Sequence, residues 1–454
     1  MRIWIDATMP AAGERFFNVT LLEHLLRTIR GAGTKTTSLA AAIKLLESFP
    51  EAAQLLRRAV RTNSHPSLIR VELSENSALD RELPDELAAS VTWSRGSGSS
   101  AARLRDAVTL ARGEPLIALS ADTVLDPRVI DRLAWSETSA AFVAPDPQGG
   151  VALRLEAALS DACWAEIGAG GLDRVVRHAV ERREVTLIPE TAFIQWIANL
   201  RRDLAPYAHR VIDRASCERA QDAVFWSNYK GSTDFLTRYV FPPFVRWALG
   251  PLTRHRVHPN SVTLVGIVLA LGAIPAFATG HWWIGLAMAF LMAALDSVDG
   301  KLARITFTSS KKGDVLDHGL DLVHPPFWYM AWGYGAAGGV ASDPLFLATC
   351  AMFAIYIFDR MLEKLFTAAT GRTIAAYAPI DVRMRTFISR RNVNLTLFAL
   401  GVVAGAPRTA LWVVFGWQVV SMLFHIVRLA QCWSVGEKRS PAAYMKADAR
   451  TIEA

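Results

Sequence analysis

A closely spaced group of acidic, small and basic residues is the part of this sequence best suited to chemistry. Asp296, Asp299 and Gly300 follow the i, i+3, i+4 spacing of one helical face, and Ala303 and Arg304 continue that face by one turn. The small residues leave room for a ligand beside the carboxylates. Arg304 has the planar fork that binds phosphate oxygens. This group predicts a helix face that holds a phosphorylated ligand.

A second group lies in the next apolar segment. Gly313, Asp317 and Asp321 recur every four residues, so they also share one helix face. If the two faces meet, four carboxylates converge, and like charges at short range raise one another's pKa values unless cations neutralise them. Hard divalent ions such as Mg²⁺ or Mn²⁺ are the natural partners of carboxylate oxygens. The alternative, solvated helix ends with capping acids, is disfavoured because ionisable groups at membrane depth are costly.

The complete pattern, Asp-x2-Asp-Gly-x2-Ala-Arg-x8-Gly-x3-Asp-x3-Asp, resembles the signature of the CDP-alcohol phosphotransferase family, and every specified position is matched. The resemblance covers about residues 230–435. It implies a membrane enzyme with two Mg²⁺ or Mn²⁺ ions that transfers a phospho-alcohol group from a CDP-alcohol donor to an acceptor hydroxyl and releases CMP. It also implies specific roles: Asp296, Asp299 and Asp317 as metal ligands, and Asp321 as general base and further metal ligand.

The same resemblance assigns the nucleotide and its phosphates to the remaining motif positions, which are Gly300, Ala303, Arg304 and Gly313. The acceptor is less clear. A basic connection between two apolar segments contains Arg383, Arg385, Arg390 and Arg391, which predict a site for a lipid or polyol-phosphate acceptor because arginine forks suit phosphate. The alternative is anchoring of a cytoplasmic loop at the membrane surface. Asp359 and Arg360 are either a buried structural pair or part of the acceptor cavity.

Composition divides the chain into two unlike halves. The 454 residues are 52% hydrophobic and 20% charged overall, but the charges concentrate before residue 235. Beyond residue 257, apolar stretches approach the roughly 20 residues that cross a bilayer. We expect a cytosolic α/β domain at 1–230, an interfacial amphipathic helix and linker at 231–256, an all-α six-span transmembrane domain at 257–435 and a cytosolic tail at 436–454. The expected spans lie near 261–279, 282–304, 314–335, 344–365, 394–406 and 409–429.

Basic residues predict the orientation of these spans. Lys and Arg gather in the connections on one side, which the positive-inside rule places in the cytoplasm together with both termini and the aspartates. The scattered cysteines and the strand-like start at Arg2–Ala7 favour an N-terminal domain that faces the cytosol. We expect the protein as a whole to be integral to a bacterial inner membrane or its equivalent. A net charge of +7 suits anionic headgroups and phosphorylated substrates. We expect no nucleic-acid partner, and the resemblance leaves a homodimer open.

The N-terminal half alternates strand and helix patterns. Arg2–Ala7, Leu68–Leu73 and Pro115–Leu119 predict strands, Thr20–Arg30 predicts a helix, and Asp122 follows the last strand where α/β folds place ligands. This layout resembles a degenerate nucleotidyltransferase domain. The segment Ala11-Ala12-Gly13-Glu14-Arg15 is similar to a phosphate-binding loop that lacks its second glycine.

Three functions therefore remain open. The first is a membrane phosphotransferase with a vestigial N-terminal domain. The second is a bifunctional enzyme that also makes its CDP-linked donor from CTP, similar to bifunctional inositol-phosphate cytidylyltransferase/di-myo-inositol-phosphate phosphate synthases. The third is a metal transporter, which the gathering of the acids at one end of the spans disfavours.

Overall fold

The computed structural model describes residues 2–17, 19–34, 69–74, 77–85, 91–95, 98–146, 149–197, 200–308 and 311–435. The side chains of residues 30–34, 80, 311–318, 320–321 and 434–435 lie outside the described part. The predicted tail at 436–454 also lies outside it. The chain forms two compact units, of which the first comprises residues 1–195 and 204–227 and the second residues 196–203 and 228–454.

The first unit is built on a seven-stranded sheet. Its strands lie in the order β10 (Thr186–Leu187), β8 (Ala140–Val143), β9 (Val151–Leu155), β6 (Leu116–Ser120), β1 (Arg2–Ala7), β4 (Ile69–Leu73) and β5 (Val91–Arg95). Strand β9 runs antiparallel to both neighbours, and the other pairs are parallel. The predicted α/β class is therefore confirmed.

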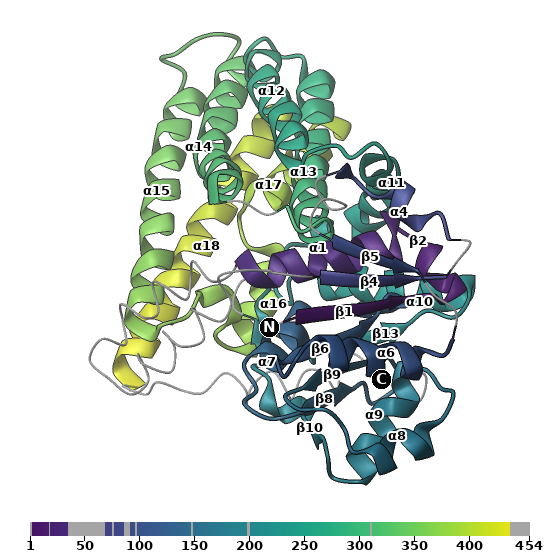
Figure 1. Cartoon of the computed structure of the whole chain (residues 1–454). Helices are drawn as coiled ribbons and strands as arrows, with labels where there is room; N and C mark the ends of the chain where they lie inside the picture. Colours follow the sequence, from purple (N-terminus) through teal and green to yellow (C-terminus); the bar gives the residue numbers. More distant parts are fainter. Residues whose placement is uncertain are drawn as a thin grey trace. The chain divides into compact units, whose positions relative to one another are not determined.

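Alternating strand residues build two cores, one on each face of this sheet. Ile5 packs with α1 (Leu21–Thr34) and α7 (Pro127–Ala134), whereas Trp4 packs with α6 (Ser100–Leu110), α8 (Asp161–Ile167) and α9 (Leu172–Glu181). This follows from the period of two in a strand, which sends neighbouring side chains to opposite faces. Figure 1 shows the helices on the two sides of the sheet. The helices α4 (Leu79–Glu82) and α10 (Arg214–Ser227) complete the unit.

The second unit is helical. Its elements are the hairpin β11 (Trp196–Ile197) and β12 (Arg202–Asp203), followed by α11 (Phe241–Arg254), α12 (Pro259–Ala278), α13 (Trp282–Ile305), α14 (Lys311–Ala336), α15 (Pro344–Thr370), α16 (Pro379–Phe387), α17 (Arg391–Val403) and α18 (Pro407–Val435). Among the described residues, α12, α13, α15 and α18 are long and apolar enough to cross a membrane. The helix α17 has only 13 residues, and α14 is 26 residues long with charges in its first turns. The count of six spans stays a prediction.

Close helix packing centres on α12, α13 and α14. A Cβ on Gly285 would lie 2.4 Å from the Phe277 ring, and one on Gly335 would lie 2.1 Å from the Phe277 carbonyl oxygen. Trp328 and Trp332 fill the space between these helices. Small residues thus let the backbones approach, as in membrane helix packing.

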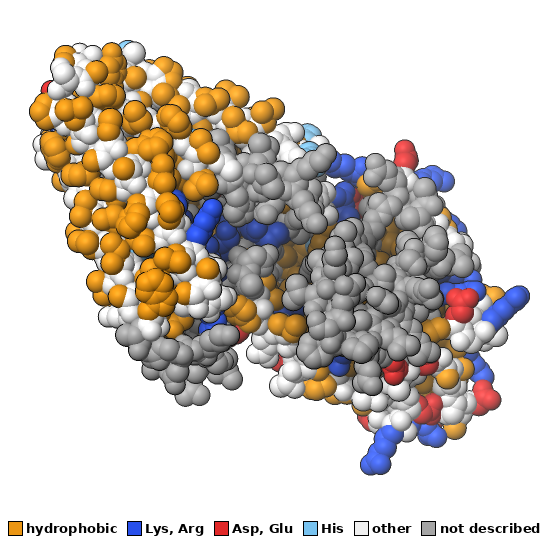
Figure 2. Space-filling view, turned by 90° about the vertical axis from the view of Figure 1, so that its left-hand side faces the viewer, with side chains coloured by type: hydrophobic (Ala, Val, Ile, Leu, Met, Phe, Trp, Pro, Cys, Tyr) orange, Lys and Arg blue, Asp and Glu red, His pale blue; other side chains and the backbone are white. Residues whose placement is uncertain are grey.

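The outer face of the helical unit is apolar. Figure 2 shows hydrophobic side chains covering most of the face turned to the viewer. Leu347, Phe358 and Met361 of α15, together with Val420 and Leu423 of α18, are exposed large hydrophobic residues. An apolar surface of this extent fits a lipid environment.

Candidate active site

All five motif residues on α13 line one cavity. Asp296, Asp299, Gly300, Ala303 and Arg304 border a space of about 320 Å³ within the helical unit. The Asp299 side chain is buried, and that of Asp296 is 21% exposed. The predicted common helix face on α13 is therefore present.

The two α13 carboxylates are oriented by neighbouring helices. The Thr263 hydroxyl on α12 donates a hydrogen bond of 2.6 Å to Oδ2 of Asp299. Nη2 of Arg391, at the start of α17, donates to Oδ2 of Asp296 at 2.8 Å. Asp299 thus accepts a hydrogen bond from a neutral hydroxyl, whereas Asp296 accepts one from a positively charged guanidinium.

The second acidic group lies on α14. Gly313, Asp317 and Asp321 are in the first turns of this helix, and α12 packs against both α13 and α14. The surroundings of Gly313 and the side chains of Asp317 and Asp321 lie outside the described part of the chain. The convergence of the two acidic faces therefore remains a prediction.

The described carboxylates fit a hard divalent ion. Both offer oxygen ligands at the wall of a polar cavity, and Mg²⁺ and Mn²⁺ prefer such ligands. A divalent ion bound to Asp296 would share this carboxylate with the guanidinium of Arg391 or displace it. Asp296 and Asp299 would hold part of the metal set, and Asp317 and Asp321 are the candidates for the rest.

Gly300 and Arg304 form a surface suited to phosphate. A Cβ at Gly300 would lie 3.5 Å from Nη1 of Arg304, so this guanidinium lies over the bare backbone of the preceding turn. Nη2 of Arg304 also donates to the Asn228 carbonyl at 3.4 Å. The fork of Arg304 is thereby directed along the cavity wall.

Lys301 is a site residue that the motif spacing did not indicate. It is buried, its ammonium lies 3.8 Å from the centre of the Tyr229 ring, and it donates to the Ser297 carbonyl at 3.3 Å. Burial raises the pKa of Tyr229, so this ring remains a neutral cation–π partner. Nothing in the spacing of Lys301 predicts this contact, because it depends on a tyrosine 72 residues earlier.

The cavity wall is predominantly basic. Eight of the described lining residues are basic and three are acidic, the basic ones being Arg201, Lys230, Lys301, Arg304, Arg360, Arg385, Arg390 and Arg391, and the acidic ones Asp234, Asp296 and Asp299. Three of the four arginines predicted for the acceptor, Arg385, Arg390 and Arg391, are thus brought together. Arg383 is exposed on α16 and is not among the lining residues.

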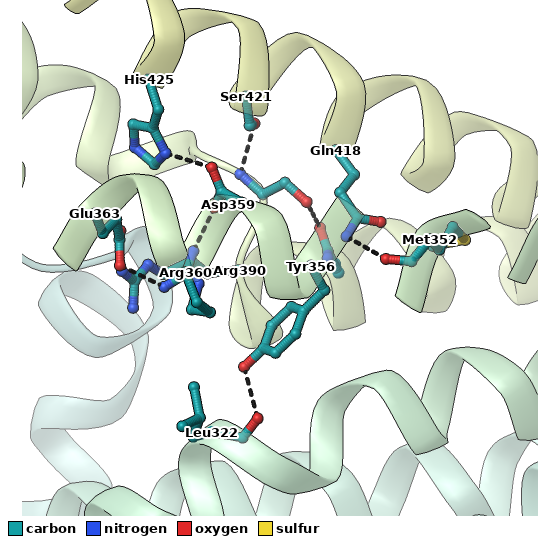
Figure 3. A network of polar contacts seen from close by, with 12 residues as sticks. Leu322, Met352, Tyr356, Asp359, Arg360, Glu363, Arg390, Gln418, Ser421 and His425 are labelled. Atoms are coloured by element: carbon teal, nitrogen blue, oxygen red, sulfur yellow. Dashed lines mark hydrogen bonds and ion pairs between the residues drawn. The ribbon is translucent and has the colours of Figure 1, made fainter. Parts of the chain in front are cut away.

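An ion-pair network holds two arginines of the cavity wall, Arg360 and Arg390 (Figure 3). Glu363 binds both Arg360 (2.7 Å) and Arg390, and Asp359 binds both Arg360 (2.6 Å) and Nδ1 of His425 (2.5 Å). Asp359, Glu363 and His425 have ligand atoms close enough to hold a metal ion. Arg360 and Arg390 already neutralise the two carboxylates, and their charge would repel a divalent ion. We therefore assign this network to positioning of the arginines.

The segment before α11 is tied to α17 by polar contacts. Nδ2 of Asn392 donates to Oδ1 of Asp234 at 3.0 Å and to the Thr237 hydroxyl at 3.2 Å, and that hydroxyl donates to Oδ2 of Asp234 at 2.8 Å. Asn392 follows Arg391 directly, so this contact fixes the start of α17 beside the motif carboxylate Asp296.

The N-terminal unit has its own polar cluster at the ends of its strands. Asp122 is buried and is bound by Nε of Arg210 at 3.2 Å, and Nη1 of Arg210 also lies 3.7 Å from Asp173. The predicted phosphate loop begins as a 3₁₀-helix at Pro10–Gly13, and its Arg15 pairs with Glu82 at 3.1 Å. Asp122 and Arg15, the two residues that would contact a nucleotide, both form ion pairs with other residues of the protein.

Comparison with known proteins identifies the helical unit. Residues 256–431 match the model of the CDP-alcohol phosphatidyltransferase family, so the C-terminal part of the chain is a CDP-alcohol phosphatidyltransferase domain. The chain is similar to Cholinephosphotransferase 1 of Gallus gallus, with 32% identity over 34% of this chain and 45% of the relative. It is also similar to the Bifunctional IPC transferase and DIPP synthase of Rubrobacter xylanophilus, with 29% identity over 34% of this chain and 33% of the relative. These matches span less than half the length of each relative.

Proposed function

We propose that this protein transfers the phospho-alcohol group of a CDP-alcohol to an acceptor hydroxyl at a membrane, with release of CMP. The observation that carries the proposal is one cavity whose wall carries both the motif carboxylates Asp296 and Asp299 and several guanidinium groups. Such an arrangement suits phosphoryl transfer, which depends on positioning and charge neutralisation more than on covalent help from the protein.

The chain's residues would divide the work along the cavity. Asp296, Asp299, Asp317 and Asp321 would hold two Mg²⁺ or Mn²⁺ ions, which when bound neutralise the charge of the diphosphate. Gly300, Ala303 and Gly313 leave room for the nucleotide beside the backbone. Arg304 would bind a phosphate oxygen, and Asp321 would accept the proton of the acceptor hydroxyl.

The setting of this reaction follows from the helices. We propose six spans, formed by α12 to α15, α17 and α18, with the aspartates near the cytoplasmic surface. The basic connection at residues 372–391 supports that orientation, because the positive-inside rule places such connections in the cytoplasm. A water-soluble acceptor would then reach the cavity from the cytoplasm. Assembly as a homodimer is a further proposal and is not needed for this site.

The N-terminal unit is proposed to be a nucleotidyltransferase-like domain that no longer makes a nucleotide product. The loop at residues 11–15 supports this, since it lacks the second glycine that lets a phosphate approach the backbone closely. The printed name of the Rubrobacter relative favours a second candidate, in which this unit makes the CDP-linked donor from CTP.

A donor and acceptor panel tests the proposed transfer. Full-length protein in detergent or nanodiscs with Mg²⁺ or Mn²⁺ should release CMP with at least one pair of a CDP-alcohol and a lipid or polyol-phosphate acceptor. Asp317→Asn and Asp321→Asn should each abolish that release. Asp343→Asn is a matched control, because Asp343 caps α15 through the Leu345 N–H and asparagine caps equally well. CMP release that persists in both motif variants would overturn the assigned roles.

A further inference from the structure

The hairpin β11–β12 belongs to the helical unit, although the 24 residues 204–227 of the other unit separate it from the rest of that unit in the sequence. Trp196 pairs with Asp203, and Ile197 pairs with Arg202. The backbone N–H of Gly231 donates to the Leu200 carbonyl at 2.8 Å. The hairpin is therefore joined to the segment that leads into the membrane helices.

Gly231 makes this close approach possible. A Cβ at this position would lie 2.7 Å from the Arg201 carbonyl oxygen and 2.9 Å from the Arg202 Cβ. Both distances are shorter than a real Cβ contact, and one of the two atoms belongs to the backbone. Any side chain at position 231 would have to push the hairpin away.

The approach places Arg201 at the cavity. Its side chain lines the same space as Arg385 and Arg390, and its Nη1 donates to the Ser232 carbonyl at 3.4 Å. Its backbone has a φ of +53°, in the left-handed region that is unfavourable for a residue with a Cβ. Strain of this kind persists where the surrounding structure imposes it, and it is frequent at functional positions.

Arg201, Arg385 and Arg390 together carry more positive charge than the neighbouring Glu363 offsets. Nε and Nη1 of Arg385 and Nε of Arg390 are buried without a hydrogen-bond partner in the part of the chain that the structure describes. Burial lowers the pKa of Arg201, the charge of Arg390 lowers it further, and Glu363 acts in the opposite direction. Guanidinium groups that line one cavity are stabilised by an anion bound among them.

We infer that Arg201, Arg385 and Arg390 bind a phosphate group carried by the acceptor, and that the hairpin supplies the arginine that completes this site. The inference rests on the proposed function and narrows its acceptor to phosphorylated polyols. Three guanidinium forks match the charge and oxygens of a phosphate dianion. A neutral lipid alcohol would leave these charges buried and uncompensated.

The chemistry of the transfer is unchanged by this site. The acceptor hydroxyl forms a bond to the alcohol-bearing phosphorus, the bond from that phosphorus to the CMP oxygen breaks, and the hydroxyl proton passes to Asp321. The acceptor's own phosphate takes no part in bond making. It holds the acceptor so that its hydroxyl is directed toward the aspartates.

Binding of inorganic phosphate tests the site without turnover. In full-length detergent-solubilised protein, inorganic phosphate should raise the melting temperature by mass action. The rise should be lost in Arg201→Asn, because asparagine accepts the left-handed backbone but removes the guanidinium. It should be kept in Arg202→Gln, a matched control on the same hairpin whose side chain does not line the cavity. A wild-type protein that phosphate does not stabilise, or an Arg201→Asn protein that it stabilises equally, would overturn the inference.

Kinetics then separate an acceptor site from a donor site. With a CDP-alcohol and polyol phosphates such as glycerol 3-phosphate or an inositol phosphate, Arg201→Asn should raise the acceptor KM roughly 10- to 100-fold, the expected loss of a charged hydrogen bond. The donor KM should stay unchanged. An increase in the donor KM instead would assign the arginines to the diphosphate and overturn the inference. If the wild type releases no CMP with any pair, the proposed function fails, while the phosphate-binding result still decides whether the anion site exists.

A second variant acts on the hairpin instead of the guanidinium. Gly231→Ala leaves all three arginines in the sequence but displaces the backbone that presents Arg201. It should weaken phosphate stabilisation and raise the acceptor KM in the same direction as Arg201→Asn. Full retention of both properties would show that the hairpin does not position the site.

Discussion

At the scale of single residues, Asp299 illustrates how a motif position depends on a partner outside the motif. Thr263 donates a hydrogen bond of 2.6 Å to its carboxylate from a different helix. Hydrogen bonds to ligating carboxylates orient them, and their removal typically costs 10- to 100-fold in metal affinity or activity. The Thr263 hydroxyl is therefore expected to act on metal binding without touching the substrate.

Thr263→Val tests this role. The variant should require roughly 10- to 100-fold more Mn²⁺ for half-maximal CMP release, because the Asp299 carboxylate loses the donor that fixes its rotamer. Thr253→Val is the matched control, since the buried Thr253 hydroxyl donates to the carbonyls of Leu249 and Gly250 within its own helix. Equal Mn²⁺ dependence in the two variants would contradict a role for Thr263 in the metal site.

Helix periodicity predicted which motif residues of α13 share one face, whereas contacts between distant segments could not be predicted from the sequence. Asp296, Asp299 and Arg304 share a face because 3.6 residues make a turn, and this could be read from spacing alone. Arg201 and Lys301 carry no comparable signal. Arg201 reaches the cavity through a hairpin, and Lys301 contacts Tyr229. Only the fold brings these segments together.

At the scale of elements, the packing of α12 against α13 and α14 depends on positions without side chains. Gly335 of α14 lies where a Cβ would be 2.1 Å from the Phe277 carbonyl oxygen, which cannot move without shifting α12. This contact sets how closely α14 approaches α12, and α14 carries the motif residues Asp317 and Asp321.

Gly335→Ala should therefore destabilise the helical unit by about 1–3 kcal/mol, the usual cost of overpacking. Gly416→Ala on α18 is the control, because an added Cβ there meets nothing within 4 Å and alanine favours the helix. Thermal unfolding in one detergent compares the two. A melting temperature for Gly335→Ala at or above that of Gly416→Ala would show that α12 and α14 do not require this close approach.

Helices and strands that are long enough to show a hydrophobic pattern were predicted from the sequence, whereas very short elements were not. The expected strands at Arg2–Ala7 and Pro115–Leu119 correspond to β1 and β6, and the expected helix at Thr20–Arg30 lies within α1. The two-residue strands β11 and β12 could not be predicted, because such short segments contain no periodicity. The position of Arg201 at the cavity therefore could not be predicted either.

At the scale of the whole molecule, the two units differ in how well their polar residues are arranged to bind a phosphorylated substrate. The acids and arginines of the helical unit line a cavity, whereas the loop at residues 11–15 of the N-terminal unit lacks the second glycine of a phosphate-binding loop. We therefore expect full-length protein to release no pyrophosphate from CTP in the presence of polyol phosphates, under conditions that support CMP release from a CDP-alcohol. Pyrophosphate formation that disappears in Asp122→Asn would instead establish the bifunctional enzyme.

The N-terminal unit should also respond to pH through a buried histidine. His24 of α1 packs against Phe16, with ring centres 4.6 Å apart, and burial lowers its pKa from 6.5 to about 3, with the charge of Arg27 acting in the same direction. The unfolded chain therefore binds a proton at a pH where the folded unit does not. Stability is fully present above pH 6.5 and is lost as the pH falls toward 3, by roughly 1.4 kcal/mol per unit.

Amide hydrogen exchange across α1 in the full-length protein measures this loss. Between pH 7.5 and pH 5.0, the opening free energy of α1, corrected for the intrinsic exchange rate, should fall by about 2 kcal/mol. His24→Leu should flatten that dependence, because leucine has no proton to gain in the unfolded state. His178→Gln should leave it intact, since His178 lies half-exposed on α9 beside Glu181. A pH dependence of α1 that is unchanged in His24→Leu would place the proton-linked group elsewhere in the unit.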